Sequence, residues 1–569
     1  MRWVVPEPLE DGAPSLAAAL ELHPLAARIL WNRGINTPEA AQAFLSDRLS
    51  DLPDPFRMKG MPGAVERILR ALKTEEKLTL WGDYDVDGVC STSLLSLFLR
   101  EVGGKVATYI PHRLDEGYGL NVEAIERIAQ DGTRVLVTLD CGITSTSEVA
   151  RAKALGLDVV VVDHHQVPET MPPADAILNP HQPGCEYPTR HLCAAGVAFN
   201  LCMGLRKRLR EDGAFASRRE PNLRSLMDLV ALATVADVVP LTGANRILVK
   251  VGLEELTQAR RPGVRALKEV AGLGADAAVS SGQVGFRLGP RINAAGRMDD
   301  ASVGLKLLCS ESLEEARALA EQLDRANAER QSVEQGILDD ALAQAELQKK
   351  ARGLVLHSDG WHPGVIGIVA SRVVERFHRP TILVAVRDGM GRGSARSIEG
   401  FHLVEALHRC AEHLAKYGGH KAAAGLSIEP DRLPAFTEQF AQVAGERLTD
   451  EDLVPRCRID AVVSLRELDE RAVEAIGRLG PFGHGNPEPV FASRRLVTHP
   501  RLLPNKRGGA GHLKLSVEGS PQFDAIGFGM EDRLPLTGGP VDLAYQVGID
   551  EFRGVRRISM KLKDVRASG

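Results

Sequence analysis

Carboxylate and imidazole side chains follow several apolar segments of this sequence, in a pattern that suits metal-dependent chemistry. The first group, Asp83, Asp85 and Asp87, occupies alternate positions in segment 82–88, directly after the apolar run 78–81. Alternate carboxylates in a turn can point their oxygens at one hard divalent cation. A solvated acidic turn is the structural alternative. A calcium loop is disfavoured because the glutamate that closes an EF-hand is missing.

Three further apolar runs end in the same kind of residue. They are 135–139 before Asp140, 159–162 before Asp163, His164 and His165, and 233–236 before Asp237. A lone Asp140 could instead cap a helix, and Asp163 could orient a histidine rather than bind a metal. Neighbouring side chains of an extended chain point in different directions, so His164 and His165 are expected to serve two metals, or one metal and the substrate.

These four places together hold six carboxylates and two imidazoles. Such a mixture of oxygen and imidazole ligands suits Mn²⁺, and Mg²⁺ less specifically, while thiolate-bound zinc is disfavoured. Converging carboxylates repel one another unless cations lie between them. Two metals about 3.5–4 Å apart are the usual arrangement for attack on phosphorus. The sequence has no Gly-x-Ser-x-Gly elbow and no P-loop lysine motif. It therefore predicts a divalent-metal phosphodiesterase.

The elements that must hold these residues are predicted to be the parallel strands of an α/β domain. Continuous Val and Leu runs that alternate with helical patterns are typical of a parallel sheet covered on both faces. Ligands of such sheets bind beyond the carboxyl ends of the strands. Segment 311–350 is rich in Ala, Glu, Gln and Leu and lacks Pro, which predicts one long helix or two broken ones. A second α/β pattern spans 353–386, and short β-like runs follow Pro455.

A chain of 569 residues is too long for a single core. We predict five parts: an N-terminal helical segment (1–55), a parallel-sheet domain (56–300), a connecting helix (301–350), a second α/β domain (351–452) and a small β-barrel (453–569).

Composition indicates a soluble protein of the cytoplasm. The eight cysteines form no Cys-x-x-Cys pair, and no signal peptide or membrane-length apolar stretch is visible. The net charge is −5, yet residues 491–569 hold 13 Lys and Arg against 8 Asp and Glu. A basic C-terminal part on an acidic body is a plausible footprint for a polyanion, although a solvated basic surface explains it equally well.

The motifs resemble those of the DHH phosphoesterase superfamily, with its DHHA1 companion domain, and within it the RecJ family of bacterial 5′→3′ single-strand DNA exonucleases. The matching segments are 82–88, 140–142, 163–165 and 236–237 for DHH, 391–397 and 418–425 for DHHA1, and 110–113, 117–120 and 288–298 for RecJ. Segment 191–196 departs from the family by having Cys and Ala where more glycine is expected.

The resemblance implies roles for single residues. Asp83, Asp85, Asp87, Asp140, His164, His165 and Asp237 fall on metal-site positions, and Asp163 joins the catalytic set as a support for the histidines. Asp83 stands where some branches of the superfamily supply a histidine. Candidates for gripping a 5′-phosphate are Arg113, Arg291, Ser394, Arg396 and His420. Arginine offers a planar fork of donors for phosphate oxygens. Tyr118 could stack on a base or fill a core.

By this resemblance the β-barrel is an OB-fold that binds a single strand more through charge than through stacking, so binding should weaken with salt. The implied function is two-metal hydrolysis of single-stranded DNA from its 5′ end to 5′-mononucleotides, in DNA repair and recombination. Single-strand-binding protein and a helicase are candidate partners, and we expect a monomer that does not bind membranes. The alternatives are a DHH phosphodiesterase acting on oligoribonucleotides or cyclic dinucleotides, and an inactive DNA-binding relative.

Overall fold

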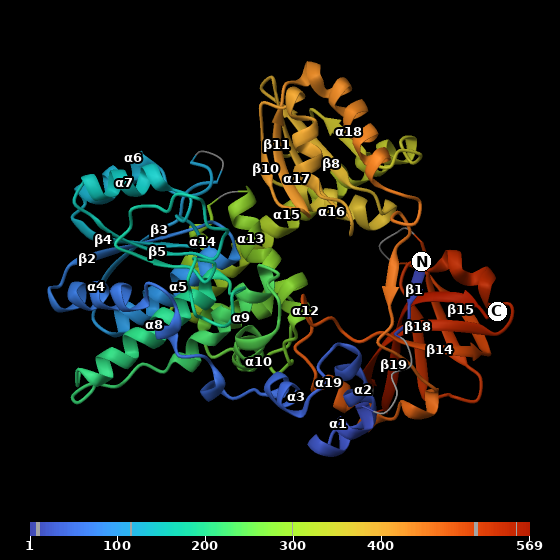
Figure 1. Cartoon of the computed structure of the whole chain (residues 1–569). Helices are drawn as coiled ribbons and strands as arrows, with labels where there is room; N and C mark the ends of the chain where they lie inside the picture. Colours follow the sequence, from blue (N-terminus) through green and yellow to red (C-terminus); the bar gives the residue numbers. More distant parts are fainter. Residues whose placement is uncertain (7–11, 114–115, 299, 506–509, 553–554, 569) are drawn as a thin grey trace. The chain divides into compact units, whose positions relative to one another are not determined.

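Figure 1 shows the computed structural model of the chain, which describes residues 1–6, 12–113, 116–298, 300–505, 510–552 and 555–568. The chain divides into two compact units. The larger unit contains Trp3–Gly296, Asp300–Glu321 and Cys457–Gly569, and the smaller unit contains Met1–Arg2, Arg297–Asp299 and Gln322–Arg456. The limits of the five predicted parts remain predictions.

A five-stranded parallel sheet forms the centre of the larger unit, in the order β3-β2-β4-β5-β6. Its strands are β2 (Lys77–Gly82), β3 (Lys105–Tyr109), β4 (Thr133–Leu139), β5 (Asp158–Val162) and β6 (Ala176–Leu178). The predicted parallel sheet is confirmed, and the runs 78–81, 135–139 and 159–162 lie in β2, β4 and β5. Strands β3 and β6 were not predicted, because β3 is only partly buried and β6 has three residues.

Helices cover both faces of this sheet (Figure 1). They are α4 (Met61–Lys73), α5 (Val86–Glu101), α6 (Val122–Gln130), α7 (Thr146–Ala154) and α8 (Ala194–Glu211). Helices α6 and α7 pack on the face formed by Trp81, Leu136, Val159 and Val161. Because successive residues of a strand point to opposite faces, Leu80, Val137 and Val160 are buried on the other side. Burial of both faces explains the continuous apolar runs.

Further helices follow the sheet along the chain. They are α9 (Met227–Ala236), α10 (Gly243–Gln258), α11 (Pro262–Val270), α12 (Ser281–Gln283), α13 (Gly289–Met298), α14 (Ser302–Cys309) and α15 (Leu313–Leu347). Helix α15 is a single helix of 35 residues, which confirms the predicted long helix. None of the helices within the described ranges has the length and apolarity needed to span a membrane.

A seven-stranded mixed sheet near the C-terminus also belongs to the larger unit, in the order β13-β14-β18-β19-β17-β16-β15. Its strands are β13 (Ala461–Val462), β14 (Phe491–Leu496), β15 (Thr498–Leu503), β16 (His512–Val517), β17 (Phe523–Gly527), β18 (Val541–Phe552) and β19 (Val555–Ala567). Helix α19 (Glu470–Gly477) lies between β13 and β14 in the sequence, and β1 (Arg2–Val4) and β12 (Arg456–Arg458) form a separate two-stranded sheet. The N-terminal helices α1 (Gly12–Leu20), α2 (Pro24–Asn32) and α3 (Pro38–Leu45) share one hydrophobic core with the seven-stranded sheet. Leu25 and Ile29 of α2 join Phe491 and Leu515 of the sheet in that core.

The smaller unit holds the second α/β pattern that the sequence predicts. Its sheet has the order β10-β11-β9-β8-β7 and is formed by β7 (Leu354–Ser358), β8 (Thr381–Arg387), β9 (Met390–Arg396), β10 (Lys416–Gly419) and β11 (Ala423–Ile428). Helices α16 (Ile366–Phe377), α17 (Leu403–Arg409) and α18 (Leu433–Arg447) complete the unit. Strands β7 and β8 run parallel, while β9, β10 and β11 are antiparallel to their neighbours.

Candidate metal centre

The loop between β2 and α5 positions the first three carboxylates. Asp85 caps α5, since its Oδ1 accepts hydrogen bonds from the backbone N–H of Asp87 (2.8 Å) and Gly88 (3.1 Å). A side chain at Gly88 would not fit, because a Cβ there would lie 2.3 Å from the carbonyl oxygen of Asp83. The tight turn therefore brings Asp83, Asp85 and Asp87 to the carboxyl edge of the sheet.

Asp87 is held from a second direction by the start of α8. Its carboxylate accepts hydrogen bonds from the backbone N–H groups of Ala194 (2.6 Å) and Ala195 (2.8 Å). The free N–H groups of a helix N-terminus favour a negative charge at that place. The unusual Cys and Ala residues of segment 191–196 thus supply the backbone that fixes Asp87.

Asp140 follows β4 in the left-handed region, with φ 66°. The next helix, α7, begins only at Thr146, and Ser145 occupies its N-cap position. The reading of Asp140 as a helix cap is therefore wrong. A left-handed conformation is uncommon for a residue with a side chain and clusters at functional sites.

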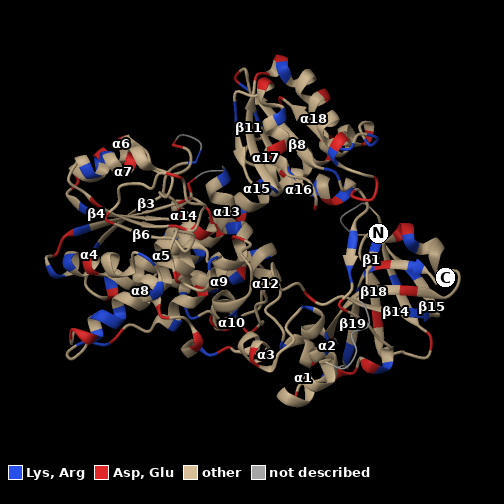
Figure 2. Ribbon diagram, in the orientation of Figure 1, with Lys and Arg blue, Asp and Glu red and all other residues tan. Residues whose placement is uncertain are grey.

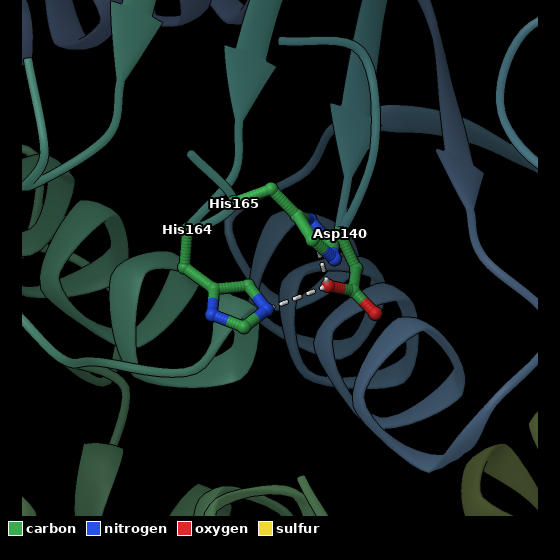
Figure 3. Close-up of side chains that lie close together, drawn as sticks. All are labelled: Asp140, His164 and His165. Atoms are coloured by element: carbon green, nitrogen blue, oxygen red, sulfur yellow. Dashed lines mark hydrogen bonds and ion pairs between the residues drawn. The ribbon is translucent and has the colours of Figure 1, made fainter. Parts of the chain in front are cut away.

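Both histidines approach Asp140, as Figure 3 shows. The Nε2 atom of His164 lies 3.1 Å from Asp140 Oδ1, and Nδ1 of His165 lies 3.9 Å from the same oxygen. The two ring centroids are 4.6 Å apart. The two rings therefore do not point to opposite sides as they would in an extended chain, because the chain bends at His165, and their assignment to two metals, or to one metal and the substrate, stays a prediction.

Asp163 lies behind these histidines. Its Oδ1 accepts hydrogen bonds from His165 Nδ1 (2.7 Å) and from the backbone N–H of His164 (2.7 Å), and its Oδ2 accepts one from Ile143 (3.0 Å). Burial alone would raise the pKa of Asp163, but the bond to His165 and the backbone donors outweigh it and hold the pKa below its usual value. Asp163 thus stays ionised and fixes the orientation of His165.

Asp237 reaches the same place from a helix. It is the C-cap residue of α9, so the expectation that all four groups follow strands is wrong for this one. An apolar run of four residues does not distinguish a buried strand from a buried helix end. The Oδ2 atom of Asp237 lies 3.6 Å from His164 Nε2, which is also 3.7 Å from Asp87 Oδ2.

Three groups of ligand atoms form, and the atoms of each group lie within 4.8 Å of one another. The groups are Asp140 with His164 and His165, Asp87 with His164 and Asp237, and Asp83 with Asp85 and Asp140. Asp140 and His164 each belong to two groups, so the three groups make one cluster. Its carboxylates are buried or half-buried, and Asp83 Oδ1 is buried without a hydrogen-bond partner among the described residues.

Crowding of buried carboxylates changes their titration. Burial raises the pKa of Asp83 to about 8 and that of Asp87 to about 7, and in both cases the charge of Asp85 adds to the rise. Burial and then Asp87 raise the pKa of Asp237 to about 8. Burial, followed by the charge of His165, lowers the pKa of His164 to about 4, which leaves its ring neutral. Neutral imidazole and crowded carboxylates are the ligands that a divalent cation takes. The cluster therefore fits bound divalent metal.

Two residues that the sequence does not single out for the metal site support it. Asn179, fully buried at the end of β6, donates from Nδ2 to the carbonyl oxygen of His165 (2.9 Å) and accepts from the N–H of His181 (2.8 Å). Tyr118 donates from its hydroxyl to the carbonyl oxygen of Asp140 (3.1 Å), and it is half-exposed rather than part of a core. The sequence gives no signal for Asn179, because the three-residue strand β6 before it was not predicted.

Comparison with known proteins identifies the family. The chain matches the DHH family, N-terminal domain, over residues 77–234, the DHHA1 domain over 350–446 and the RecJ OB domain over 459–564. It is 42% identical over 558 residues to the single-stranded-DNA-specific exonuclease RecJ of Dickeya dadantii, covering 95% of each chain. It is 39% identical over 565 residues to that of Escherichia coli, covering 96% of each. The chain belongs to the RecJ family.

Solved RecJ structures agree with this assignment. The crystal structure of Thermus thermophilus RecJ in complex with Mn²⁺ matches with a TM-score of 0.85 and 32% identity, covering 100% of this chain and 80% of that one. A structure of the same protein in complex with Mg²⁺ matches with a TM-score of 0.79. The resemblance and the fold class expected from the sequence, including the OB-like C-terminal part, are thereby confirmed.

The candidate phosphate ligands of this RecJ-family chain occur in both units. In the larger unit the guanidinium of Arg113 lies over the ring of Tyr84, 4.8 Å from its centroid. Arg291 donates to the carbonyl oxygens of Arg287 (2.6 Å) and Val270 (3.3 Å), so part of its donor capacity serves helix packing. Its role toward phosphate remains a prediction.

Ser394 and Arg396 lie together in the smaller unit. Arg396 Nη1 donates to Ser394 Oγ (3.2 Å) and to the carbonyl oxygen of Ala395 (2.8 Å). Gly367, in the first turn of α16, lies against both, since a Cβ there would be 2.9 Å from Ser394 Oγ and 3.1 Å from Arg396 Nη2. Burial lowers the pKa of Arg396, and no carboxylate of the described residues pairs with it. His420 is exposed in the turn between β10 and β11. A partly buried arginine beside a helix N-terminus suits an anion.

Proposed function

We propose that this RecJ-family chain is a metal-dependent exonuclease that hydrolyses single-stranded DNA from its 5′ end to 5′-mononucleotides. The observation that carries the proposal is the single cluster in which three ligand groups share Asp140 and His164. The names of the relatives from Dickeya dadantii and Escherichia coli support the substrate, because these proteins are single-stranded-DNA-specific exonucleases.

Two divalent cations, Mn²⁺ or Mg²⁺, would be held by seven residues: Asp83, Asp85, Asp87, Asp140, His164, His165 and Asp237. When bound, they would activate a water and stabilise charge on the phosphoryl oxygens. The protein supplies the orientation of these ligands: the α8 N-terminus holds Asp87, and Asp163 holds His165. Burial would lower the pKa of His165, but the hydrogen bond to Asp163 raises it to about 9, so a metal bound by His165 would displace a proton from the ring.

The proposed 5′→3′ direction results from binding of the terminal 5′-phosphate by the protein. Arg113, Ser394, Arg396 and His420 are the proposed ligands, and Arg291 is a further candidate. Arg396 supports this best, because a guanidinium without a carboxylate partner can bind phosphate through a fork of donors. A strand without a free 5′ end would then be a poor substrate.

The C-terminal sheet is proposed to bind the strand beyond the cleaved end. Arg557 and Lys561 are an even number of positions apart in β19, so their side chains share one face, and the charge of Lys561 acts on Lys563 at the register shift of this strand. Figure 2 colours the basic residues of this sheet blue. Arg494 and Arg501 add positive charge on β14 and β15, and neither forms an ion pair with a described residue. Affinity for DNA should therefore fall steeply as salt rises.

The cellular setting is also proposed. An exonuclease of this kind acts in DNA repair and recombination in the cytoplasm, as a monomer. Single-strand-binding protein and a helicase are the proposed partners. We also propose that the chain has five parts, with boundaries at residues 55, 300, 350 and 452.

Hydrolysis of end-labelled strands tests the activity. Single-stranded DNA labelled at the 5′ or at the 3′ end is incubated with Mn²⁺ and the wild type, Asp140→Asn or Asp131→Asn. Asp131 is an exposed carboxylate paired with Lys77, so it is the control. We expect early release of labelled mononucleotide from the 5′-labelled strand only, lost in Asp140→Asn by more than about 100-fold and kept in Asp131→Asn. Early release from the 3′ label would refute the direction. Faster hydrolysis of a cyclic dinucleotide or an oligoribonucleotide would refute the substrate.

A further inference from the structure

The loop that carries Asp237 is held by a turn from the C-terminal part of the chain. Asp237 ends α9, and α10 begins at Gly243, so residues 238–242 join the two helices. The backbone N–H of Leu241 donates to the carbonyl oxygen of His484 (2.7 Å). That oxygen belongs to the turn 482–486, which precedes the first long strand of the C-terminal sheet. The loop and the turn are more than 230 residues apart in sequence, and both lie in the larger unit.

Close packing adds to this bond. Gly485 has φ 72°, and a Cβ at this position would lie 2.8 Å from Cβ and 3.1 Å from Cα of Pro240. A Cβ at Gly483 would lie 2.8 Å from Cδ1 of Leu241, the end of a flexible side chain. The backbone of the turn therefore lies directly against Pro240 and Leu241, three and four residues after Asp237.

The turn is itself firmly anchored. Asn486 is buried and donates from Nδ2 to the carbonyl oxygens of Leu479 and Pro481, each at 2.9 Å. Ser281 donates from Oγ to the carbonyl oxygen of Phe482 (2.7 Å), and Arg246 of α10 donates to that of Gly480 (2.7 Å). The turn and the residues just before it are thus bonded to α12 and α10, and the turn cannot shift without breaking buried hydrogen bonds.

The loop needs such support, because its backbone is strained. Val238, the residue after Asp237, has φ 58°, and its side chain is 62% exposed. A β-branched residue rarely adopts this conformation, which persists only where the surroundings impose it. The exposed side chain of Val238 makes too few contacts to hold the backbone in this conformation. The loop is held instead at Pro240 and Leu241, by the contacts with the turn and by the hydrogen bond from Asn245 Nδ2 to the carbonyl oxygen of Pro240 (3.0 Å).

We infer that the turn 482–486 positions Asp237 as a metal ligand, so that the C-terminal part contributes to metal affinity as well as to DNA binding. This inference rests on the proposed function, in which Asp237 binds metal. The turn acts through its backbone and through the absence of side chains at Gly483 and Gly485. The residues of the turn are positioning residues, since none of them reaches the cluster through a contact described above.

Three glycine substitutions in the C-terminal part test this inference. Gly485→Ala introduces a Cβ against Pro240, Gly483→Ala introduces one against a flexible side chain, and Gly519→Ala is the control. Gly519 has φ 68° and nothing within 4 Å of its Cβ position, so the control carries the same backbone strain without a collision. Mn²⁺ affinity is measured by calorimetry on folded protein without DNA, and affinity for a labelled single strand is measured in EDTA.

We expect Gly485→Ala to weaken Mn²⁺ binding by about tenfold, Gly483→Ala to weaken it less, and Gly519→Ala to leave it unchanged. Affinity for the strand in EDTA should be equal in all four proteins. Equal Mn²⁺ affinity of Gly485→Ala and Gly519→Ala overturns the inference, and so does a loss confined to strand binding. If Gly485→Ala does not fold, an unchanged Mn²⁺ affinity of Gly483→Ala overturns it. A wild type without Mn²⁺ affinity, or an Asp140→Asn protein that binds Mn²⁺ equally well, instead refutes the proposed metal site.

Discussion

Charged side chains lie at both edges of the parallel sheet, but their partners differ between the two edges. At the amino edge, Arg67 of α4 donates to Asp158 at the start of β5 and to Glu76 just before β2, each at 2.5 Å. Lys153 also reaches Asp158 (3.0 Å). At the carboxyl edge of the same strands, carboxylates meet other carboxylates and two histidines, with no Lys or Arg ion pair to any of them in the described part of the chain.

Titration reflects this difference. Burial would raise the pKa of Asp158 and of Glu76, yet Lys153 and Arg67 hold the first below its usual value and Arg67 holds the second. The pKa of Asp83 and of Asp237 is instead raised to about 8. Charges at the amino edge are thus paired within the protein, while charges at the carboxyl edge need cations from outside. One sheet therefore has one edge that stabilises the fold and one that binds ligands.

Removing Arg67 from the amino edge should have the largest effect on stability. Arg67→Ala leaves Glu76 and part of the charge of Asp158 unpaired in a mostly buried place, and we expect the free energy of unfolding to fall by about 2–3 kcal/mol. Lys105→Ala is the control, because Lys105 begins β3 at the same edge and its pair with Glu75 is exposed. Urea unfolding measures the first effect. Mn²⁺ affinity of folded Arg67→Ala should equal that of the wild type, and a loss of affinity would contradict the division between the edges.

Raising the pH should strengthen Mn²⁺ binding at the carboxyl edge. The raised pKa values of about 7 for Asp87 and about 8 for Asp83 and Asp237 mean that all three carboxylates are mostly protonated at pH 6, while at pH 8 Asp87 is mostly ionised and Asp83 and Asp237 are about half ionised. Metal must displace those protons. For one displaced proton, affinity rises about tenfold per pH unit, or about 100-fold from pH 6 to pH 8. Calorimetry in two buffers of different ionisation enthalpy measures the protons released. An affinity independent of pH would show that the carboxylates are already ionised.

Neutralising one carboxylate should stabilise the metal-free protein. A group whose pKa is raised by folding stabilises the native state at low pH and loses that contribution as the pH rises to its folded pKa. For Asp83 the loss extends from about pH 4 to about pH 8. Asp83→Asn avoids it, so its stability in EDTA should exceed that of the wild type by about 1–2 kcal/mol at pH 8.5 and by less at pH 5. Thermal unfolding at both pH values measures this. Destabilisation at pH 8.5 would show that Asp83 has a partner that the charge pattern does not reveal.

The carboxyl edge was more predictable from the sequence than its supports were. Apolar runs buried on both faces of a sheet are continuous, so β2, β4 and β5 and the acids after them could be predicted. Asp237 was predicted as a site residue, but after a strand, whereas it follows helix α9. This helix is buried on all sides, so its apolar run shows no helical period. The shared core of α2 and the C-terminal sheet could not be predicted, since local pattern says nothing about contacts between distant segments. The hydrogen bonds from Ala194 and Ala195 to Asp87 could not be predicted for the same reason.

Asn179 offers the finest test, because it supports the carboxyl edge without carrying charge. Its Nδ2 bond to the carbonyl oxygen of His165 fixes the turn that presents both histidines. We expect Asn179→Ala to weaken Mn²⁺ binding by about tenfold. Gln182→Ala is the matched control: Gln182 is a buried amide three residues further on that donates to the carbonyl oxygens of Ile177 (2.7 Å) and Asn179 (3.3 Å), and it makes no described bond to the turn 163–165.

Both substitutions remove buried hydrogen bonds, so both should lower the unfolding temperature. Only Asn179→Ala should lower Mn²⁺ affinity at a temperature where both proteins are folded, because only Asn179 bonds to the turn 163–165. Equal losses of affinity would mean that the cluster responds to general loosening of the sheet edge. In that case the ligands at the carboxyl edge would depend on overall stability, and the two edges of the sheet would not be independent.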